Sequence, residues 1–459
     1  MTNWMRFVVV AFGTLVGPLD SAVNIAFPSI TGAFGVPQSA IQWVVVCYVI
    51  SYATLLLIFG RLGDLFGHLR VFQAGLAICA LAFLGSGLAD RFEMLLFTRG
   101  LQGIGTAMVL SCGPALTTSL FHDHQRTRAL GAFAAVIGLG SAIGPSLGGI
   151  LVEIWGWPAV FWFRLPIAVL TLVATLFLPM PQQVRADGRF DLPGAMCLAA
   201  GLGTLLIAIS RLRYGALALT EILVLGSVLA AAAVLLLVRR REGGDAVVQF
   251  SMFRNLDLSL VTLTGIAVNL VGFAVMLFVP YFLSRMTALP VTMGGLVLAI
   301  SPLGMMLAGQ AGPRIAERFG AKPTAFAGVV LVAAGTGGVG LWAPNEAIAV
   351  MAATSLVHGL GLGLYQVAQL DVSVASLPRA NRGVAGSLVM LSRTLGVIIA
   401  ASLLTALFVA LEGGGNSAGN DARFLGAFQQ TFQLSGAGLA VFVALTCLLP
   451  RAWFAPVRT

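Results

Sequence analysis

Residues 8–30 read VVVAFGTLVGPLDSAVNIAFPSI and contain one charged side chain, Asp20. A transmembrane helix needs about 20 predominantly apolar residues, so this stretch is long enough to cross a bilayer. A carboxylate at bilayer depth costs about 2.5–3.5 kcal/mol on insertion scales. Acids in such positions usually face an internal, hydrated cavity, where a lone carboxyl group can carry a proton. Asp20 is therefore the first candidate functional residue.

The composition of the whole chain agrees with a membrane location. Of its 459 residues, 58% are hydrophobic and only 9% are charged, whereas the surface of a soluble domain needs far more charge. The first apolar run is too long for a signal peptide and lacks a small-residue cleavage site, so we expect it to be the first span. The five Cys and four His are scattered singly, which predicts neither a disulfide framework nor a metal site.

The pattern of apolar segments predicts an all-α polytopic membrane protein with about fourteen transmembrane helices. Loops between these segments are short, so no extramembrane domain is expected. The expected spans are 6–30, 40–60, 70–89, 93–120, 126–152, 158–180, 191–210, 218–238, 258–284, 291–311, 323–342, 347–371, 386–411 and 430–450.

The distribution of Lys and Arg predicts the orientation. With the N-terminus in the cytoplasm, 18 of the 26 basic residues fall on the cytoplasmic side, five fall outside and three lie within spans. This bias follows the positive-inside rule and places both termini inside, in a bacterial-type inner membrane. The net charge of +9 is explained by the same rule, so it does not point to a nucleic-acid partner.

Two loops of the sequence resemble each other. Residues 60–70 read GRLGDLFGHLR and residues 312–322 read GPRIAERFGAK, each with an acid shortly before a Phe-Gly pair and a base nearby. This similarity between the loops predicts two related six-helix bundles at 1–183 and 246–459, with an inserted helix pair at 184–245. Pseudo-symmetric halves around a central site are typical of secondary transporters.

These loops are candidates for a conformational gate. Asp64 could meet basic residues or a helix N-terminus of the other half, where an anion is favoured, and so latch one state. The alternative is that Asp64 and Arg70 only anchor a solvated loop. The proposed gate residues are Gly60, Asp64, Gly67, Arg70, Glu317 and Gly320.

A run of small residues marks the fifth expected span. Small residues let helices pack closely in membranes, and Pro145 adds a kink. We expect this face to pack tightly, as a seam against the other half. The run comprises Gly140, Gly144, Pro145, Gly148 and Gly149.

Polar side chains within the spans are candidates for a substrate cavity. Each is more often a helix–helix hydrogen bond than a ligand contact. Arg99 could also extend to the membrane interface, since it lies near the outer end of its span. Besides Arg99, the candidates are Asn24, Gln42, Tyr48, Gln102, Arg164, Asn269, Tyr281, Gln366 and Arg393.

Taken in order, these motifs resemble the major facilitator superfamily, and specifically its fourteen-span drug:proton antiporters. The resemblance rests on Leu19–Pro28, Gln42-Trp43, the loop Gly60–Arg70, Arg99–Gly105, Gly140–Gly149, Phe190–Gly194 and Arg382–Gly396. It implies that Arg99 lies in the cavity near Asp20, that the two act in proton coupling, and that the glycine-rich fifth helix limits leak.

Two features of the sequence depart from that family. Arg164 stands where the family usually has Asn, so it could pair with an acid, bind an anionic substrate, or reach the interface. The spans lack the additional acids of relatives that export dications, which makes the chain less suited to doubly charged cations and leaves lipophilic monocations, neutral amphiphiles and anions open.

The sequence therefore predicts a proton-coupled exporter of small amphiphilic or drug-like molecules. The alternatives are an exporter of a specific metabolite or anion on the same scaffold, and a non-transporting receptor or scaffold. The sequence contains no nucleophile–base arrangement of the kind found in enzymes, so we do not expect an enzyme. We expect no cofactor beyond the proton gradient, and as partners a small-molecule substrate, protons and lipid, with the protein acting as a monomer.

Overall fold

The computed structural model describes residues 3–121, 123–177, 204, 226, 255–376, 383–413, 421–448 and 453–454. The predicted spans 191–210 and 218–238 lie outside these residues, apart from Thr204 and Gly226. The chain divides into two units, residues 1–244 and 245–459. The finer division into two six-helix bundles and an inserted pair stays a prediction.

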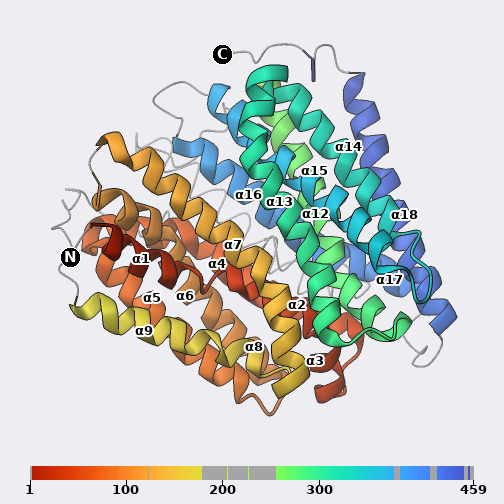
Figure 1. The fold of residues 1–459 in the computed structure, drawn as a ribbon, viewed down its shortest axis with the longest axis horizontal. Coiled ribbons are helices and arrows are strands. Elements are labelled where there is room, and N and C mark those ends of the chain that lie inside the picture. The colour runs from red at the N-terminus through yellow and green to blue at the C-terminus, as the bar shows by residue number, and fades with distance from the viewer. Residues whose placement is uncertain are drawn as a thin grey trace. The chain divides into compact units, whose positions relative to one another are not determined.

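The described part of the first unit is helical, with its first predicted span divided into several short pieces (Figure 1). Long helices α4 to α7 follow, and α4 and α5 both pack against α6. The helices are α1 (Asn3–Thr14), η1 (Pro18–Ser21), α2 (Ala22–Ile25), α3 (Phe27–Phe34), η2 (Gln38–Ala40), α4 (Ile41–Phe66), α5 (His68–Gly87), α6 (Phe92–Ser119), α7 (Asp123–Trp155), α8 (Ala159–Trp162) and α9 (Arg164–Phe177).

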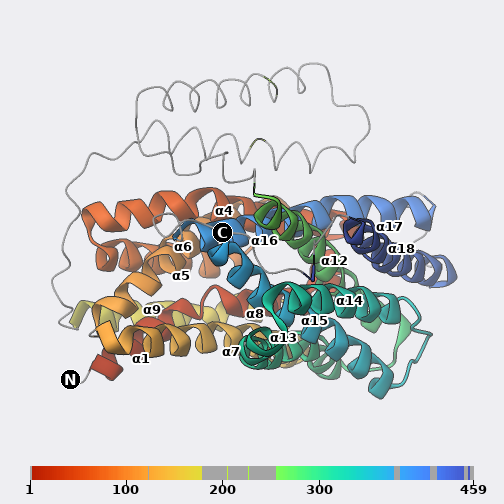
Figure 2. The ribbon, with the colours of Figure 1, turned by 90° about the horizontal axis from the view of Figure 1, so that it is seen from above.

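The second unit is built from long helices in the same way, and both α13 and α14 pack against α15. Figure 2 shows α17 and α18 side by side in this unit, in agreement with their contacts. The elements are α12 (Leu256–Met286), α13 (Val291–Phe319), α14 (Ala321–Val339), α15 (Ile348–Ala375), α16 (Gly383–Ile399), the π-helical turn η6 (Ala400–Leu404), α17 (Thr405–Glu412) and α18 (Asp421–Cys447).

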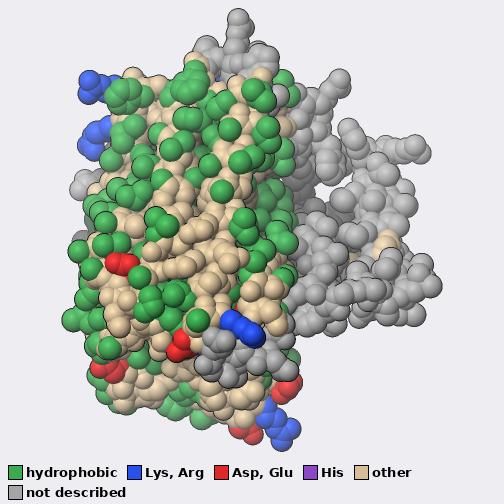
Figure 3. Space-filling model, turned by 90° about the vertical axis from the view of Figure 1, so that its right-hand side faces the viewer, with side chains coloured by type: hydrophobic (Ala, Val, Ile, Leu, Met, Phe, Trp, Pro, Cys, Tyr) green, Lys and Arg blue, Asp and Glu red, His purple; other side chains and the backbone are tan. Residues whose placement is uncertain are grey.

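Eleven helical segments of the described residues are long and apolar enough to cross a membrane. Their outward side chains include Leu170, Phe177, Leu263 and Leu445, each more than half exposed. On the face shown in Figure 3, hydrophobic side chains predominate and charged ones lie mainly near the upper and lower ends. Such a continuous apolar surface needs a bilayer to cover it. The predicted span 93–120 forms helix α6 but is not among the eleven.

The two similar loops have similar backbones. Gly67 joins α4 to α5 with φ 100°, and Gly320 joins α13 to α14 with φ 94°. The amide of each donates to a carbonyl four residues earlier, at 2.9 Å and 2.8 Å. Only glycine adopts these positive φ values without strain, which explains why both loops have glycine at this point.

We predict that Gly320→Ala lowers the free energy of unfolding by about 1–3 kcal/mol, the usual cost of a side chain in this backbone region. Thermal unfolding of the purified protein in detergent measures it. Gly309→Ala is the control, because Gly309 lies in helical α13 and an added Cβ there has no neighbour within 4 Å. Equal melting temperatures for the two variants would contradict the explanation.

Candidate functional site: an acid held by two arginines

The first span is broken at the position of Asp20. After α1 ends at Thr14, the next three amides bond to carbonyls three residues earlier, at 3.2–3.4 Å. Pro18 has no N–H to continue an α-helix, and the chain forms the tight turn η1 before helix resumes at Ala22. Broken helices near the middle of a membrane often carry transporter binding sites.

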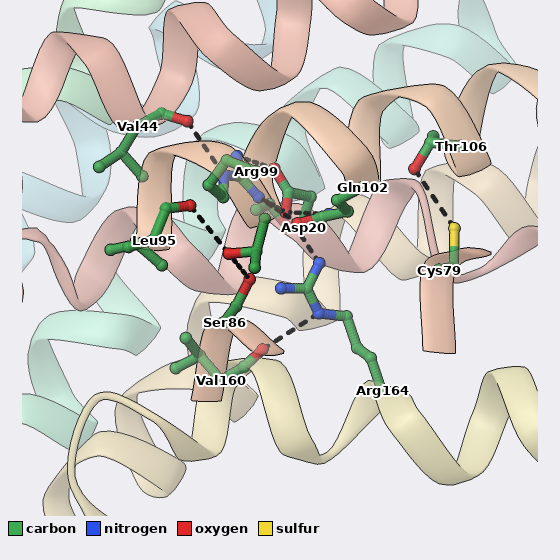
Figure 4. A network of polar contacts seen from close by, with 12 residues as sticks. Asp20, Val44, Cys79, Ser86, Leu95, Arg99, Gln102, Thr106, Val160 and Arg164 are labelled. Carbon is green, nitrogen blue, oxygen red and sulfur yellow. Dashed lines mark hydrogen bonds and ion pairs between the residues drawn. The ribbon is translucent and has the colours of Figure 1, made fainter. Parts of the chain in front are cut away.

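The Asp20 carboxylate lies among donors from two other parts of the unit (Figure 4). Arg99 in α6 donates from Nη1 to Oδ1 at 2.6 Å and from Nη2 to Oδ2 at 2.9 Å. Arg164 donates from Nη1 to Oδ1 at 2.8 Å, and Gln102 donates from Nε2 to Oδ1 at 2.9 Å. The bidentate contact with Arg99 is the strong form of a carboxylate–guanidinium pair.

Arg99 is fixed by further contacts. Its Nε donates to the Val44 carbonyl at 3.0 Å, and its Nη1 also donates to Gln102 Oε1 at 2.6 Å. Its guanidinium carbon lies 4.4 Å from the centre of the Tyr48 ring, a cation–π distance. Arg99 therefore points into the protein and does not extend to the membrane interface.

Arg164 is the first residue of α9, directly after the break that follows α8. Its Nε donates to the Val160 carbonyl at 3.0 Å, and its guanidinium lies 4.5 Å from the centre of the Phe83 ring. Of the three roles that the sequence left open, the structure shows pairing with an acid, Asp20. Snorkelling is wrong, because the side chain is fully buried.

Exposure differs sharply within this cluster. The Asp20 side chain is 15% exposed, whereas those of Arg99 and Arg164 are 2% and 0% exposed. Buried charges are tolerated only when ion pairs and hydrogen bonds replace hydration. Asp20 is thus the most exposed of the three charged side chains.

The glycine face of α7 packs against the segment that carries Asp20. A Cβ added at Gly148 would lie 2.6 Å from the Ala22 carbonyl oxygen, and one at Gly144 would collide with Ser21 Oγ. Ser21 Oγ also donates to the Ser141 carbonyl at 3.1 Å. The tight packing that the small residues predict is present, but the contacts are with the first span of the same unit, where we expected the other half.

Gly140 belongs to the same face, since a Cβ there would lie 2.8 Å from Leu15 Cδ2. Pro145 and Gly149 are buried within α7. The face therefore fixes the position of the broken turn, and a role in limiting leak stays a prediction.

We predict that Gly144→Ala pushes Ser21 away and displaces the neighbouring Asp20 carboxylate. Overpacking of this kind costs about 1–3 kcal/mol. Where that cost falls on the transport-competent position of Asp20, the transport rate should fall by about fivefold to 100-fold, since 1.4 kcal/mol is tenfold. Initial transport rates in proteoliposomes measure it. The control is Gly32→Ala in α3, where an added Cβ has no neighbour within 4 Å. Unchanged rates for Gly144→Ala would show that the close contact is unimportant.

The predicted gate residues lie near the ends of α4 and α13. Arg70 and Glu317 are exposed, and Gly60 is half-buried. The backbone of Asp64 is helical, but its side chain lies outside the described residues. The latch therefore stays a prediction.

The other cavity candidates of the first unit lie near the Asp20 cluster in sequence or in space. Gln42 and Gln102 are fully buried, and Gln102 bonds to Asp20. Tyr48 stacks on Tyr52 at a ring distance of 6.2 Å besides contacting Arg99. Asn24 is half-buried, one helical turn beyond Asp20.

The cavity candidates of the second unit differ from one another in burial. Asn269 is buried and donates to the Gly265 carbonyl of its own helix at 2.7 Å, which favours a structural role. Tyr281 is buried as well. Gln366 is half-buried and Arg393 is exposed.

Two buried polar pairs of the second unit were missed from the sequence. Lys322 Nζ donates to Asp257 Oδ1 at 2.6 Å, and Ser301 Oγ lies 2.9 Å from His358 Nδ1. The charge distribution predicts Lys322 in a cytoplasmic segment, but its side chain is only 2% exposed. Helical spacing gives no signal for either pair, because the partners come from different helices.

Membrane-crossing helices with an internal acid–arginine cluster define a polytopic membrane transporter. The particular family follows from the sequence comparison: the model of the Major Facilitator Superfamily matches residues 10–401. The chain belongs to this family.

Several relatives have names that describe transport or export. The chain is 25% identical to the riboflavin transporter RibZ of Clostridioides difficile, over 88% of each chain. It is 28% identical to a probable actinorhodin transporter of Streptomyces coelicolor, covering 95% of this chain and 77% of that one. It is also 28% identical to the tetracenomycin C resistance and export protein of Streptomyces glaucescens, covering 89% and 77%.

Solved structures support the fold. A POT family transporter in complex with 5-aminolevulinic acid superposes with a TM-score of 0.71 at 12% identity, over 97% of this chain and 96% of that one. A bacterial homologue of the lysosomal transporter Spinster gives a TM-score of 0.69 at 16% identity, over 96% and 95%. Identities this low show a shared fold and carry no information on substrate.

Proposed function

We propose that this protein is a proton-coupled exporter of small amphiphilic, drug-like molecules across the cytoplasmic membrane. It belongs, in this proposal, to the fourteen-span drug:proton antiporters, has both termini in the cytoplasm, acts as a monomer and needs no cofactor. The observation that carries the proposal is Asp20: it lies at a break in a transmembrane helix, its carboxylate pairs with two buried arginines, and its side chain is 15% exposed.

The proposed cycle uses Asp20 as the proton site. When the cavity faces the cytoplasm, Asp20 is ionised and held by the two arginines through the contacts described above. When the cavity faces the more acidic outer side, the carboxyl group takes up a proton and the cargo leaves. The protonated site returns inward and releases the proton to the cytoplasm.

One proton per cycle supplies enough free energy to move cargo against a concentration gradient. One charge moved across 100 mV is worth about 2.3 kcal/mol, and 1.4 kcal/mol is a factor of ten. One proton per cycle can thus support a gradient of roughly tens-fold in cargo.

Flux measurements in proteoliposomes test the proposal. A pH gradient and a membrane potential are imposed separately, and the movement of a fluorescent aromatic amphiphile and of protons is recorded together. We expect cargo to drive proton movement in the opposite direction, and a pH gradient to drive cargo against its own gradient. Cargo movement without any proton movement would overturn the proposal.

A second candidate, export of a specific anionic metabolite, has one observation in its favour. Arg164 stands where the resembling family usually has a neutral amide, and it adds a full positive charge to the site. A positive charge in excess of the local acids favours an anionic cargo over a cationic one.

A further inference from the structure

The charges of the Asp20 cluster do not balance. Arg99 and Arg164 each carry one positive charge, and both contact the single carboxylate of Asp20. Among the residues that the structure describes, neither guanidinium contacts a second carboxylate. With all three groups ionised, the buried cluster has a net charge of +1.

Arg164 also has an unused hydrogen-bond donor. Its Nη1 donates to Asp20 and its Nε to the Val160 carbonyl, but its buried Nη2 has no partner among the described residues. An unsatisfied buried donor on a charged group is costly. The lack of an acceptor and the excess positive charge occur on the same side chain, and an anionic ligand group would supply both the acceptor and the countercharge.

The surroundings of this side chain are apolar and aromatic. The guanidinium carbon of Arg164 lies 4.5 Å from the centre of the Phe83 ring and 5.4 Å from that of Phe161. A ligand at this position would place its acidic group on the arginines and an apolar body among ring systems.

We propose that the cargo is an amphiphile with one negative charge, such as a carboxylate or an acidic phenol on an apolar body, and that Arg164 selects it. This inference rests on the proposed export function and names its substrate class. An anionic cargo makes the loaded cluster neutral, whereas a monovalent cation would raise its charge to +2. Because like charges repel strongly where the dielectric constant is low, the site rejects cations.

The positions of the three side chains determine how such a cargo binds. Asp20 is the most exposed of the three side chains and contacts both guanidinium groups, whose side chains are 2% and 0% exposed. The acidic group of the cargo therefore displaces Asp20 from one guanidinium, and the two carboxylates share the two arginines. With the cargo bound and Asp20 ionised, the loaded site has no net charge.

The inference is tested with three matched probes that share one aromatic body and carry a carboxylate, a methyl ester or a primary amine. Binding to the purified protein is measured by ligand-dependent thermal stabilisation, which follows from preferential binding to the folded state. For the wild type we expect the acid to bind about tenfold or more tightly than the amine, since one charge–charge interaction of 1.4 kcal/mol gives tenfold.

The decisive variants are Arg164→Asn and Arg164→Lys. In Arg164→Asn the site is neutral without cargo, so the preference for the acid should vanish and the amine should bind at least as well. Arg164→Lys keeps the charge and should keep the preference. Comparing probes within one variant removes any effect of the substitution on folding. An unchanged acid-to-amine ratio in Arg164→Asn, or a wild type that prefers the amine, would overturn the inference.

Transport of the same probes separates this inference from the export function. If a pH gradient drives the amine or the ester but not the acid in the wild type, the substrate class is wrong and proton-coupled export stands. If the acid binds with the predicted selectivity but no gradient moves any probe, the proposed function fails and the anion site stands.

Discussion

Replacing Asp20 with Asn is expected to reduce gradient-driven transport to background, by about 100-fold or more. The amide cannot take up and release the proton, and it leaves Arg99 and Arg164 buried without the carboxylate that both contact. Breaking one partner of a buried ion pair costs about 3–5 kcal/mol, and 1.4 kcal/mol is tenfold. The measurement is uptake of a fluorescent amphiphile into proteoliposomes under an imposed pH gradient, with proton movement recorded in the same vesicles.

The control for this experiment is Asp90→Asn. Asp90 is exposed near the end of α5 and contacts none of the cluster residues that the structure describes. We expect it to transport like the wild type. Asp20→Glu keeps the charge on a longer side chain and should retain part of the coupled flux. If Asp20→Asn accumulates cargo against a gradient as well as Asp90→Asn does, Asp20 is not the proton site.

The sequence predicted the central features of this site for a clear physical reason. A charge inside an apolar segment is rare enough to mark function, so Asp20 and Arg99 stood out from composition alone. The membrane class and eleven of the fourteen expected spans followed from the length of apolar runs. The contact between Asp20 and Arg99 was implied by the family resemblance and is present in the structure.

The partner of Arg164 was not predictable in the same way. Residues 20 and 164 are 144 positions apart in sequence, and helical periodicity says nothing about which helices adjoin. The break in the first span had a signal, because Gly17-Pro18 directly precedes Leu19-Asp20 and such pairs interrupt helices. That signal predicts a turn at Asp20, where the carboxylate can face hydrogen-bond donors inside the protein.

The glycines of α7 illustrate a further limit. Small residues predict a close contact but do not identify the neighbour. Gly144 and Gly148 proved to contact Ser21 and Ala22, so this face holds the segment of the proposed proton site in place. The effect on transport that we predict for Gly144→Ala thus has a local explanation within the first unit.

The second prediction with a large effect concerns a different unit and stability. Lys322→Met is expected to lower the free energy of unfolding by about 3–5 kcal/mol, because it breaks a 2.6 Å ion pair between side chains that are only 2% and 8% exposed. The pair joins the starts of α12 and α14. Asn255 caps α12 two residues before Asp257: its side chain accepts a hydrogen bond from the Asp257 amide at 2.9 Å and donates to the Ser376 carbonyl at 3.2 Å. Loss of the pair should therefore loosen these helix ends together.

A double-mutant cycle isolates this interaction. Asp257→Asn in the Lys322→Met background replaces the second partner of the pair as well and should restore most of the lost stability, since replacing both partners of a buried pair is often nearly neutral. The control is Asp421→Asn, which breaks a 3.1 Å pair with Arg285 in the same unit, where Asp421 is 67% exposed. Exposed pairs contribute about 0–1 kcal/mol. If Lys322→Met lowers the free energy of unfolding no more than Asp421→Asn does, burial does not determine the strength of these ion pairs. The same reasoning about the Asp20 cluster would then lose its basis.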